Sequence, residues 1–238
     1  MDITALIVTL IICTGVALSI ALRKLSVAGA LTGGGLAWLL YKGIGVTGII
    51  MLAAFFIAGT IATTIGASRK ERLGMAEKNK GQRSAWQVLA NGGVAGIAGL
   101  IAWLNPGQQV IAQLVAAAAL ASAAADTLSS ELGSPYGSRF YNILSLKRDQ
   151  AGLDGVISIE GTLYGIGGSA LIAFIYITGY RYAAHGWWIL LAGTAGNLAD
   201  SILGASLQRK GRLTNDMVNG LNTLVAAIVV VLCYWIFL

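Results

Sequence analysis

Long runs of apolar residues, separated by short charged or glycine-rich breaks, dominate the sequence. About 20 apolar residues are enough to cross a bilayer as a helix. The pattern predicts an all-α, polytopic integral membrane protein with about eight transmembrane helices in a single transmembrane domain, residues 1–238. The helices are expected at Ile3–Leu22, Ser26–Tyr41, Val46–Gly66, Ala85–Leu104, Gln108–Leu132, Val156–Gly179, Gly186–Leu207 and Met217–Phe237.

The composition supports a membrane protein and argues against a soluble domain. Hydrophobic residues make up 56% of the chain and charged residues 11%, whereas soluble domains carry about 25% charged residues. The first apolar segment has no basic residues before it, so we expect a membrane helix rather than a cleaved signal peptide. Cys13 and Cys233 fall inside predicted helices, which argues against a disulfide. The single histidine, His185, is expected in an exposed loop.

The basic residues fall in alternate breaks between the predicted helices. Lys42 and Arg181 occupy one side, and the other 14 of the 16 Lys and Arg residues occupy the other. Because loops rich in Lys and Arg stay in the cytoplasm, this asymmetry predicts that the basic loops are cytoplasmic and that both termini lie outside. The protein is therefore expected in the cell (inner) membrane.

Two carboxylates stand near the ends of apolar segments, each inside a similar short motif. The motifs are Ala125-Asp126-Thr127 and Ala199-Asp200-Ser201. An acid at membrane depth costs about 3 kcal/mol on insertion scales, so it is usually kept for a function. Glu131 and Asp216 lie closer to the predicted interface on the same side.

Amide and hydroxyl residues gather at the same side. Gln87 and Asn91 open one outward helix, and Asn215 and Asn219 open the last. Such residues also hold membrane helices together, and for Gln87 and Asn91 packing and function are equally open. Together with the acids, they predict a polar pocket that opens to the cytoplasm.

Acids with nearby cations at a cytoplasmic pocket suggest a divalent metal that holds a phosphate-bearing ligand. Mg²⁺ uses one or two carboxylates together with phosphate oxygens and water. Phosphoryl transfer needs metal, carboxylates and cations to position groups and neutralise charge. No Walker-type loop and no set of protein-kinase motifs occurs in the sequence. No nucleic-acid partner is expected.

A family resemblance runs through nearly the whole chain. It is carried in order by Arg23-Lys24-Leu25-Ser26, Gly81-Gln82-Arg83 with Gln87 to Gly93, Ala125-Asp126-Thr127 with Ser130-Glu131-Leu132-Gly133, Asp154-Gly155 to Gly161-Thr162, Ala199-Asp200-Ser201 to Gln208, and Asn215-Asp216 with Val218-Asn219. The sequence resembles the membrane-protein family that includes plant phytyl-phosphate kinase. That resemblance implies a kinase that converts an isoprenoid monophosphate into the diphosphate, with CTP as the donor.

Two weaker similarities accompany it. The stretch from Asp126 to Gly137 is similar to the Asp- and Gly-rich motif of the CTP-dependent dolichol and phytol kinases, with Ser129 where Ala is common. The stretch from Asp200 to Asp216 is similar to CDP-lipid synthases, but their Lys-Asp and Pro-Gly-His-Gly pattern is missing. The first similarity therefore supports a kinase. The missing pattern weakens the second similarity, which would indicate a cytidylyltransferase.

Roles follow for named residues. The catalytic residues are expected to be Asp126, Asp200, Glu131 and Arg83. Mg²⁺ is expected on Asp126, Glu131, Asp200 and Asp216. The nucleotide and phosphates are expected on Lys78, Lys80, Gln87, Asn91, Thr127, Ser130, Ser201, Asn215 and Asn219. The expected partners are the lipid bilayer, an isoprenoid monophosphate and a nucleotide.

A transporter or flippase for an anionic isoprenoid or a similar solute is the alternative. The repeated Asp motif could reflect an internal repeat, as in many transporters. Such a protein should also carry polar residues near the midplane and an exit path, whereas the polar residues here crowd at one face. The kinase interpretation instead predicts a lateral apolar groove that opens to lipid at the depth of Asp126 and Asp200.

Overall fold

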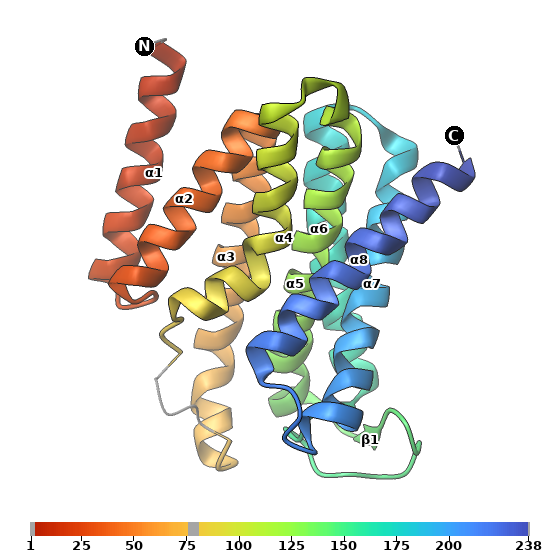
Figure 1. Cartoon of the computed structure of the whole chain (residues 1–238). Helices are drawn as coiled ribbons and strands as arrows, with labels where there is room; N and C mark the ends of the chain where they lie inside the picture. The colour runs from red at the N-terminus through yellow and green to blue at the C-terminus, as the bar shows by residue number, and fades with distance from the viewer. Residues whose placement is uncertain (1–2, 76–80, 238) are drawn as a thin grey trace.

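The computed structural model describes residues 3–75 and 81–237, and within these ranges it holds eight α-helices. They are α1 (Ile3–Ala21), α2 (Val27–Ile44), α3 (Val46–Arg72), α4 (Ala85–Leu104), α5 (Gln109–Tyr136), α6 (Ile159–Tyr180), α7 (Ala183–Leu203) and α8 (Asn215–Phe237). The helices stand side by side, and both ends of the chain lie at the same end of the bundle (Figure 1).

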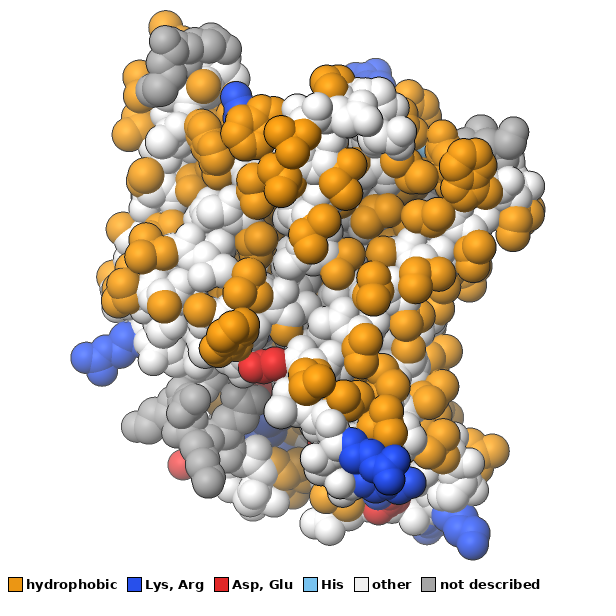
Figure 2. Space-filling model, in the orientation of Figure 1, with side chains coloured by type: hydrophobic (Ala, Val, Ile, Leu, Met, Phe, Trp, Pro, Cys, Tyr) orange, Lys and Arg blue, Asp and Glu red, His pale blue; other side chains and the backbone are white. Residues whose placement is uncertain are grey.

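The predicted all-α, polytopic membrane architecture is confirmed. Six of the helices in the described ranges, α1, α3, α4, α5, α6 and α8, are long and apolar enough to cross a membrane. Hydrophobic side chains cover the tall body of the face seen in Figure 2, and Lys and Arg are most prominent towards its lower end. The number of helices that cross the membrane and the side on which the termini lie stay predictions.

Two helices extend further toward the basic end than predicted. α3 ends at Arg72 rather than Gly66, and α5 ends at Tyr136 rather than Leu132. The extensions hold each other in place, because the Tyr136 hydroxyl donates to the Ile65 carbonyl at 3.2 Å and the Arg69 guanidinium lies 4.9 Å from the centre of the Tyr136 ring. Hydropathy alone misses these turns because they are polar.

A small hairpin replaces the predicted start of α6. Strand β1 (Tyr141–Asn142) pairs antiparallel with β2 (Val156–Ile157), so Val156 lies in a strand and not in a helix. Ser158 then caps α6 by accepting from the Gly161 amide at 3.0 Å. Gly155, just before β2, has φ +70° and packs against Ser201 and Ala205, a position where a side chain would be both strained and crowded.

The region around α7 also differs from the prediction. The helix starts at Ala183 rather than Gly186, and it is followed by the π-helical segment η2 (Gly204–Gln208). The expectation that His185 lies in an exposed loop was wrong. The residue is buried in α7, its Nδ1 lies 3.1 Å from the Tyr176 hydroxyl, and its ring stacks between Tyr182 and Trp188.

Helix α5 is the centre of the bundle, in contact with α3, α4, α6, α7 and α8. Its alanines from Ala116 to Ala121 are fully buried along with Leu120. Small side chains let neighbouring backbones approach closely in a membrane, where packing rather than hydrophobicity drives helix association. At Gly168 of α6, an added Cβ would lie 2.7 Å from the carbonyl oxygen of Ala124. This close crossing fixes the turn of α5 that leads into Asp126.

Two neighbouring glycines of α6 test the crossing. Gly168→Ala forces the two backbones apart, and we expect it to lower the free energy of unfolding by about 1–3 kcal/mol. Gly167→Ala is the matched control, since a Cβ there meets nothing within 4 Å, and a helical Gly→Ala change is neutral or favourable. Thermal unfolding in detergent is the measurement, and equal melting temperatures for the two variants would contradict the close crossing.

Candidate functional site

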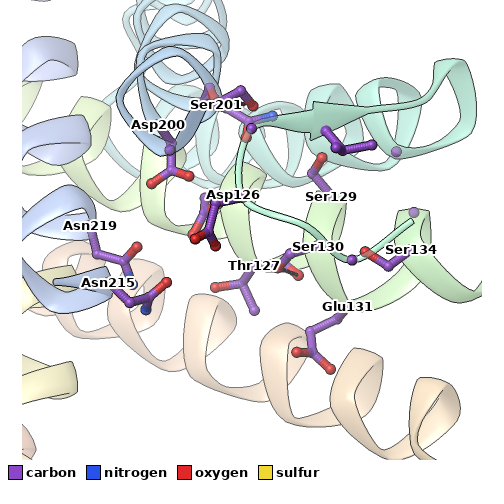
Figure 3. Close-up of a pocket in the computed structure, with 18 of the residues that line it drawn as sticks. Asp126, Thr127, Ser129, Ser130, Glu131, Ser134, Asp200, Ser201, Asn215 and Asn219 are labelled. Atoms are coloured by element: carbon purple, nitrogen blue, oxygen red, sulfur yellow. Dashed lines mark hydrogen bonds between the residues drawn. The ribbon is translucent and has the colours of Figure 1, made fainter. Parts of the chain in front are cut away.

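A polar pocket of about 370 Å³ lies at the basic end of the bundle. Its walls come from the ends of α3, α4, α5, α7 and α8 that lie nearest the basic loops, and from the segment that joins α5 to α6. Residues distant in sequence therefore meet in one cavity. Figure 3 shows the side chains that point into it.

Asp126 and Asp200 occupy the centre of this pocket. Asp126 comes from α5 and Asp200 from the neighbouring α7, and their carboxyls lie close to each other in the pocket. Both side chains point into the same space, toward Asn215 and Asn219 (Figure 3). The two similar motifs therefore build one site rather than two.

A buried polar chain orients Asp200. Asn222 of α8 donates from Nδ2 to Asp200 Oδ1 at 2.8 Å. The Asn222 Oδ1 in turn accepts from the Ser122 hydroxyl of α5 at 3.1 Å, and both Asn222 and Ser122 are fully buried. Asn222 was not among the expected site residues, although its spacing from Asn215 and Asn219 places it on the same helical face. It acts through Asp200 as a positioning residue.

Glu131 lines the pocket but already has a cationic partner. Lys70 Nζ lies 2.8 Å from Glu131 Oε1, and the two side chains are only 13% and 10% exposed. Asp216 is not among the residues that line the pocket. Over residues 3–75 and 81–237, no group of three or more His, Cys, Asp or Glu side chains is placed to hold a metal. Of the four carboxylates expected to bind Mg²⁺, Asp126, Glu131 and Asp200 therefore line the pocket, and Asp126 and Asp200 have no ion pair within the described part of the chain.

Arg83 reaches the pocket from a short stretch between α3 and α4. Its backbone pairs with the segment between α1 and α2: the Arg83 amide donates to the Lys24 carbonyl and the Ser26 amide donates to the Arg83 carbonyl, both at 3.0 Å. Its guanidinium lies over the rings of Phe55 and Phe56, at 5.6 and 5.9 Å. The two motifs around Arg23 and Gly81, which carry the family resemblance, therefore pair with each other and hold the backbone of Arg83 in place.

Gln87 and Asn91 follow Arg83 along the same face of α4. Gln87 Oε1 accepts from the Ser84 amide at 2.8 Å in a capping box, so part of its role is to start the helix. Asn91 donates from Nδ2 to the Gln87 carbonyl at 2.9 Å. Its Oδ1 is buried, and it has no hydrogen-bond partner within the described part of the chain. A buried acceptor left without a donor costs about 1–3 kcal/mol, which points to a ligand or water.

The structure gathers most of the remaining expected residues. Thr127, Ser130, Ser201, Asn215 and Asn219 all line the pocket, whereas Lys78 and Lys80 lie outside the described residues. The lining also includes residues that the sequence analysis did not assign to the site: Gln82, Ser129, Ser134, Asn197, Gln208 and the segment 152–158. Several of these belong to the stretches that carry the family resemblance, which was the only signal for them.

The segment between α5 and α6 forms one wall and is tied to η2. Asp149 pairs with Arg209 at 2.8 Å, and Asp154 Oδ1 accepts from Gln208 at 2.9 Å. The Gln150 amide and Arg209 lower the pKa of Asp149, whereas burial raises the pKa of Asp154. These contacts hold the wall against the end of α7, beside Asp200.

The pocket carries more acids than bases. Its described lining holds the acids Asp126, Glu131, Asp154 and Asp200 against the bases Lys70 and Arg83. An anionic ligand would be repelled unless a cation entered with it. Two facing carboxylates, with free room for other oxygen ligands, fit Mg²⁺, which takes one or two carboxylates and completes its octahedron with phosphate oxygens and water.

Comparison with known proteins places the chain in a family. Residues 10–227 match the integral membrane protein family DUF92. The chain belongs to this family. It is 32% identical to the chloroplastic protein VTE6 of Arabidopsis thaliana over 213 residues, which cover 87% of this chain but only 63% of VTE6.

Two microbial relatives match more of their own length. An uncharacterized membrane protein of Synechocystis sp. is 34% identical over 84% of this chain and 80% of its own. An uncharacterized membrane protein of Methanocaldococcus jannaschii is 36% identical over 78% of this chain and 76% of its own. No solved structure matches the chain.

The Lys70–Glu131 pair can be tested for a structural role. Glu131→Gln leaves the Lys70 charge nearly buried and unpaired, so we expect a loss of about 3–5 kcal/mol in the free energy of unfolding. The double variant Lys70→Met, Glu131→Gln should lose clearly less than the sum of the two single variants, because the single changes each strand a charge. Denaturation of the four proteins in detergent measures the coupling, and strict additivity would contradict the pair.

Proposed function

We propose that the protein is a lipid-phosphate kinase that transfers a phosphoryl group from a nucleoside triphosphate to an isoprenoid monophosphate at the cytoplasmic membrane face. CTP is the proposed donor. The observation that carries the proposal is the facing pair Asp126 and Asp200, set beside Arg83 in a polar pocket within a bundle of apolar helices. The resemblance to the family that includes plant phytyl-phosphate kinase supports the reaction.

The residues of the pocket divide into two groups. Asp126 and Asp200 would hold Mg²⁺, which would neutralise the charge that develops on the phosphates. Arg83 is placed to hold phosphate oxygens, since a guanidinium can bind them in a bidentate manner. Asn222 and Ser122 keep Asp200 oriented. Thr127, Ser201, Asn215 and Asn219 offer hydroxyl and amide groups around the same space.

The reaction needs little beyond positioning. An oxygen of the acceptor monophosphate forms a bond to the terminal phosphorus of the nucleotide, and the bond from that phosphorus to its bridging oxygen breaks, so that a nucleoside diphosphate leaves. A phosphate monoester has a second pKa of about 6, so the acceptor is already largely ionised at neutral pH. The carboxylates are therefore not required as general bases, which suits a role in metal binding.

The transporter alternative finds less support in the packing. Beyond the pocket, the middle of the bundle is filled by fully buried residues: Leu114, Leu120, Ile172, Tyr176 and Ile189, together with the alanines of α5. A solute path would have to run through this closed core. A site for chemistry at one face fits these contacts better.

The direct test is phosphoryl transfer by the purified protein. With labelled CTP, Mg²⁺ and a panel of prenyl monophosphates, we expect labelled prenyl diphosphate. Asp126→Asn and Asp200→Asn should each reduce turnover by about 100-fold or more, comparable to the loss of a principal electrostatic group. Glu71→Gln is the control, since Glu71 is exposed at the same end of the protein and does not line the pocket. Full turnover in both aspartate variants would refute the proposal.

Arg83→Lys tests the phosphate contact. Lysine keeps the charge but loses the bidentate fork and the planar stack on Phe55 and Phe56, so we expect the KM for the prenyl monophosphate to rise by roughly tenfold. Arg72→Lys, at the exposed end of α3, is the control and should behave like the unaltered protein. A normal KM for Arg83→Lys would return the residue to a purely structural role.

A further inference from the structure

A second cavity, of about 470 Å³, is bounded by α1, α2, α3 and α4. Its lining is almost entirely apolar and consists mainly of isoleucine, leucine and phenylalanine side chains and of glycine backbone; examples are Ile11, Ile12, Gly15, Leu52, Phe56 and Ile57. A cavity of this kind is suited to hydrocarbon and offers little to a polar ligand.

The apolar cavity lies beside the polar pocket and shares lining residues with it. Arg83, Gln87 and Asn91 line both of them. A ligand that filled both would have a hydrocarbon part between α1 and α4 and a polar end beside Asp126. The charged residue at this boundary is Arg83, whose guanidinium lies over the rings of Phe55 and Phe56, two residues that line the apolar cavity.

We propose that this cavity, here called the chain groove, holds the hydrocarbon chain of a single-chain lipid phosphate whose phosphate lies at Arg83. That this lipid is the phosphoryl acceptor rests on the proposed function, whereas its binding does not. The guanidinium selects an anionic head group over a neutral one. Because Arg83, Gln87 and Asn91 line both cavities, a phosphate held at Arg83 would also face the acidic pocket.

Asn91 supplies an independent observation. The residue is only 8% exposed, it lines both cavities, and its Oδ1 has no hydrogen-bond partner among the described residues. This oxygen needs a donor located where the groove meets the pocket. A hydrated or protonated phosphate head group would bring one to this point, and a hydrocarbon chain alone would not.

The length of the groove indicates a long chain. Its lining runs along α1 from Ile11 to Leu22 and along α3 from Ile49 to Ile61, which at 1.5 Å per residue corresponds to about 16–18 Å. A chain that moves from lipid into this groove stays in apolar surroundings, so it gains little hydrophobic free energy. The shape of the groove would therefore determine which hydrocarbon chains fit, and contacts with the phosphate head group would supply most of the binding affinity for the lipid.

Two glycines give a matched test of the groove. Gly15 lines it from α1, and Gly35 of α2 does not. An added Cβ meets nothing within 4 Å at either position. We therefore expect leucine at position 15 to take up space in the groove, and leucine at position 35 to leave the groove unchanged. Helix α1 packs chiefly against α2, so the fold should tolerate both changes.

The experiment is photo-crosslinking of the purified full-length protein, without nucleotide, to a prenyl monophosphate with a photoreactive group at the far end of its chain. We expect the crosslinks to map to α1 and α3 within the groove. Gly15→Leu should reduce labelling by roughly tenfold, equivalent to about 1.4 kcal/mol. Gly35→Leu should label like the unaltered protein, and a matching prenyl alcohol should label more weakly than the phosphate.

Crosslinks only to residues outside the groove, or equal labelling of the two glycine variants, would overturn the inference. Since no nucleotide is present, the result does not depend on catalysis. Specific labelling of the groove in a protein that never transfers phosphate would uphold the lipid site and reject the kinase. Phosphoryl transfer together with crosslinks outside the groove would uphold the kinase and reject the lipid site.

Discussion

Two carboxylates held face to face among apolar helices are the constraint on which this structure depends. Asp126 and Asp200 repel each other when both are ionised, and a charge in such surroundings is costly. Of the two cations in the described lining of the pocket, Lys70 is engaged with Glu131, and Arg83 lies over the rings of Phe55 and Phe56. Asn222 donates a hydrogen bond to Asp200. A bound cation would compensate the negative charge that remains on the two carboxylates. The arrangement makes sense if a metal ion belongs between them.

The two halves of the bundle serve this constraint differently. Away from the pocket, the alanines of α5 and glycines such as Gly168 bring helix backbones close together. This packing fixes the position of α5 and therefore the direction in which the Asp126 side chain points. At the basic end, the helices separate around the pocket, and the segment between α5 and α6 closes one side through Asp149 and Arg209. A rigid half therefore positions the groups that the open half uses.

Much of this could be predicted from the sequence, because hydropathy marks helices and charge marks their ends. The repeated Ala-Asp motif singled out Asp126 and Asp200, and the amides Gln87 and Asn91 were expected beside the same pocket, which all four residues line. The hairpin at Val156 could not be predicted, since its pairing is between distant residues. The Lys70–Glu131 pair could not be predicted because Lys70 lies in the polar extension of α3, whose composition is typical of a loop. The burial of His185 depends on aromatic neighbours from two helices, and the place of Asp216 depends on where α8 begins its turn.

The central claim is that Asp126 and Asp200 together hold a divalent metal that contacts phosphate. The most direct measurement is electron paramagnetic resonance of Mn²⁺ in place of Mg²⁺, with a non-hydrolysable CTP analogue bound to the purified protein. The account predicts a bound Mn²⁺ with phosphorus hyperfine coupling, whose affinity falls by about tenfold or more in Asp126→Asn and in Asp200→Asn. Unchanged Mn²⁺ binding in both variants, or a bound ion without phosphorus coupling, would contradict it.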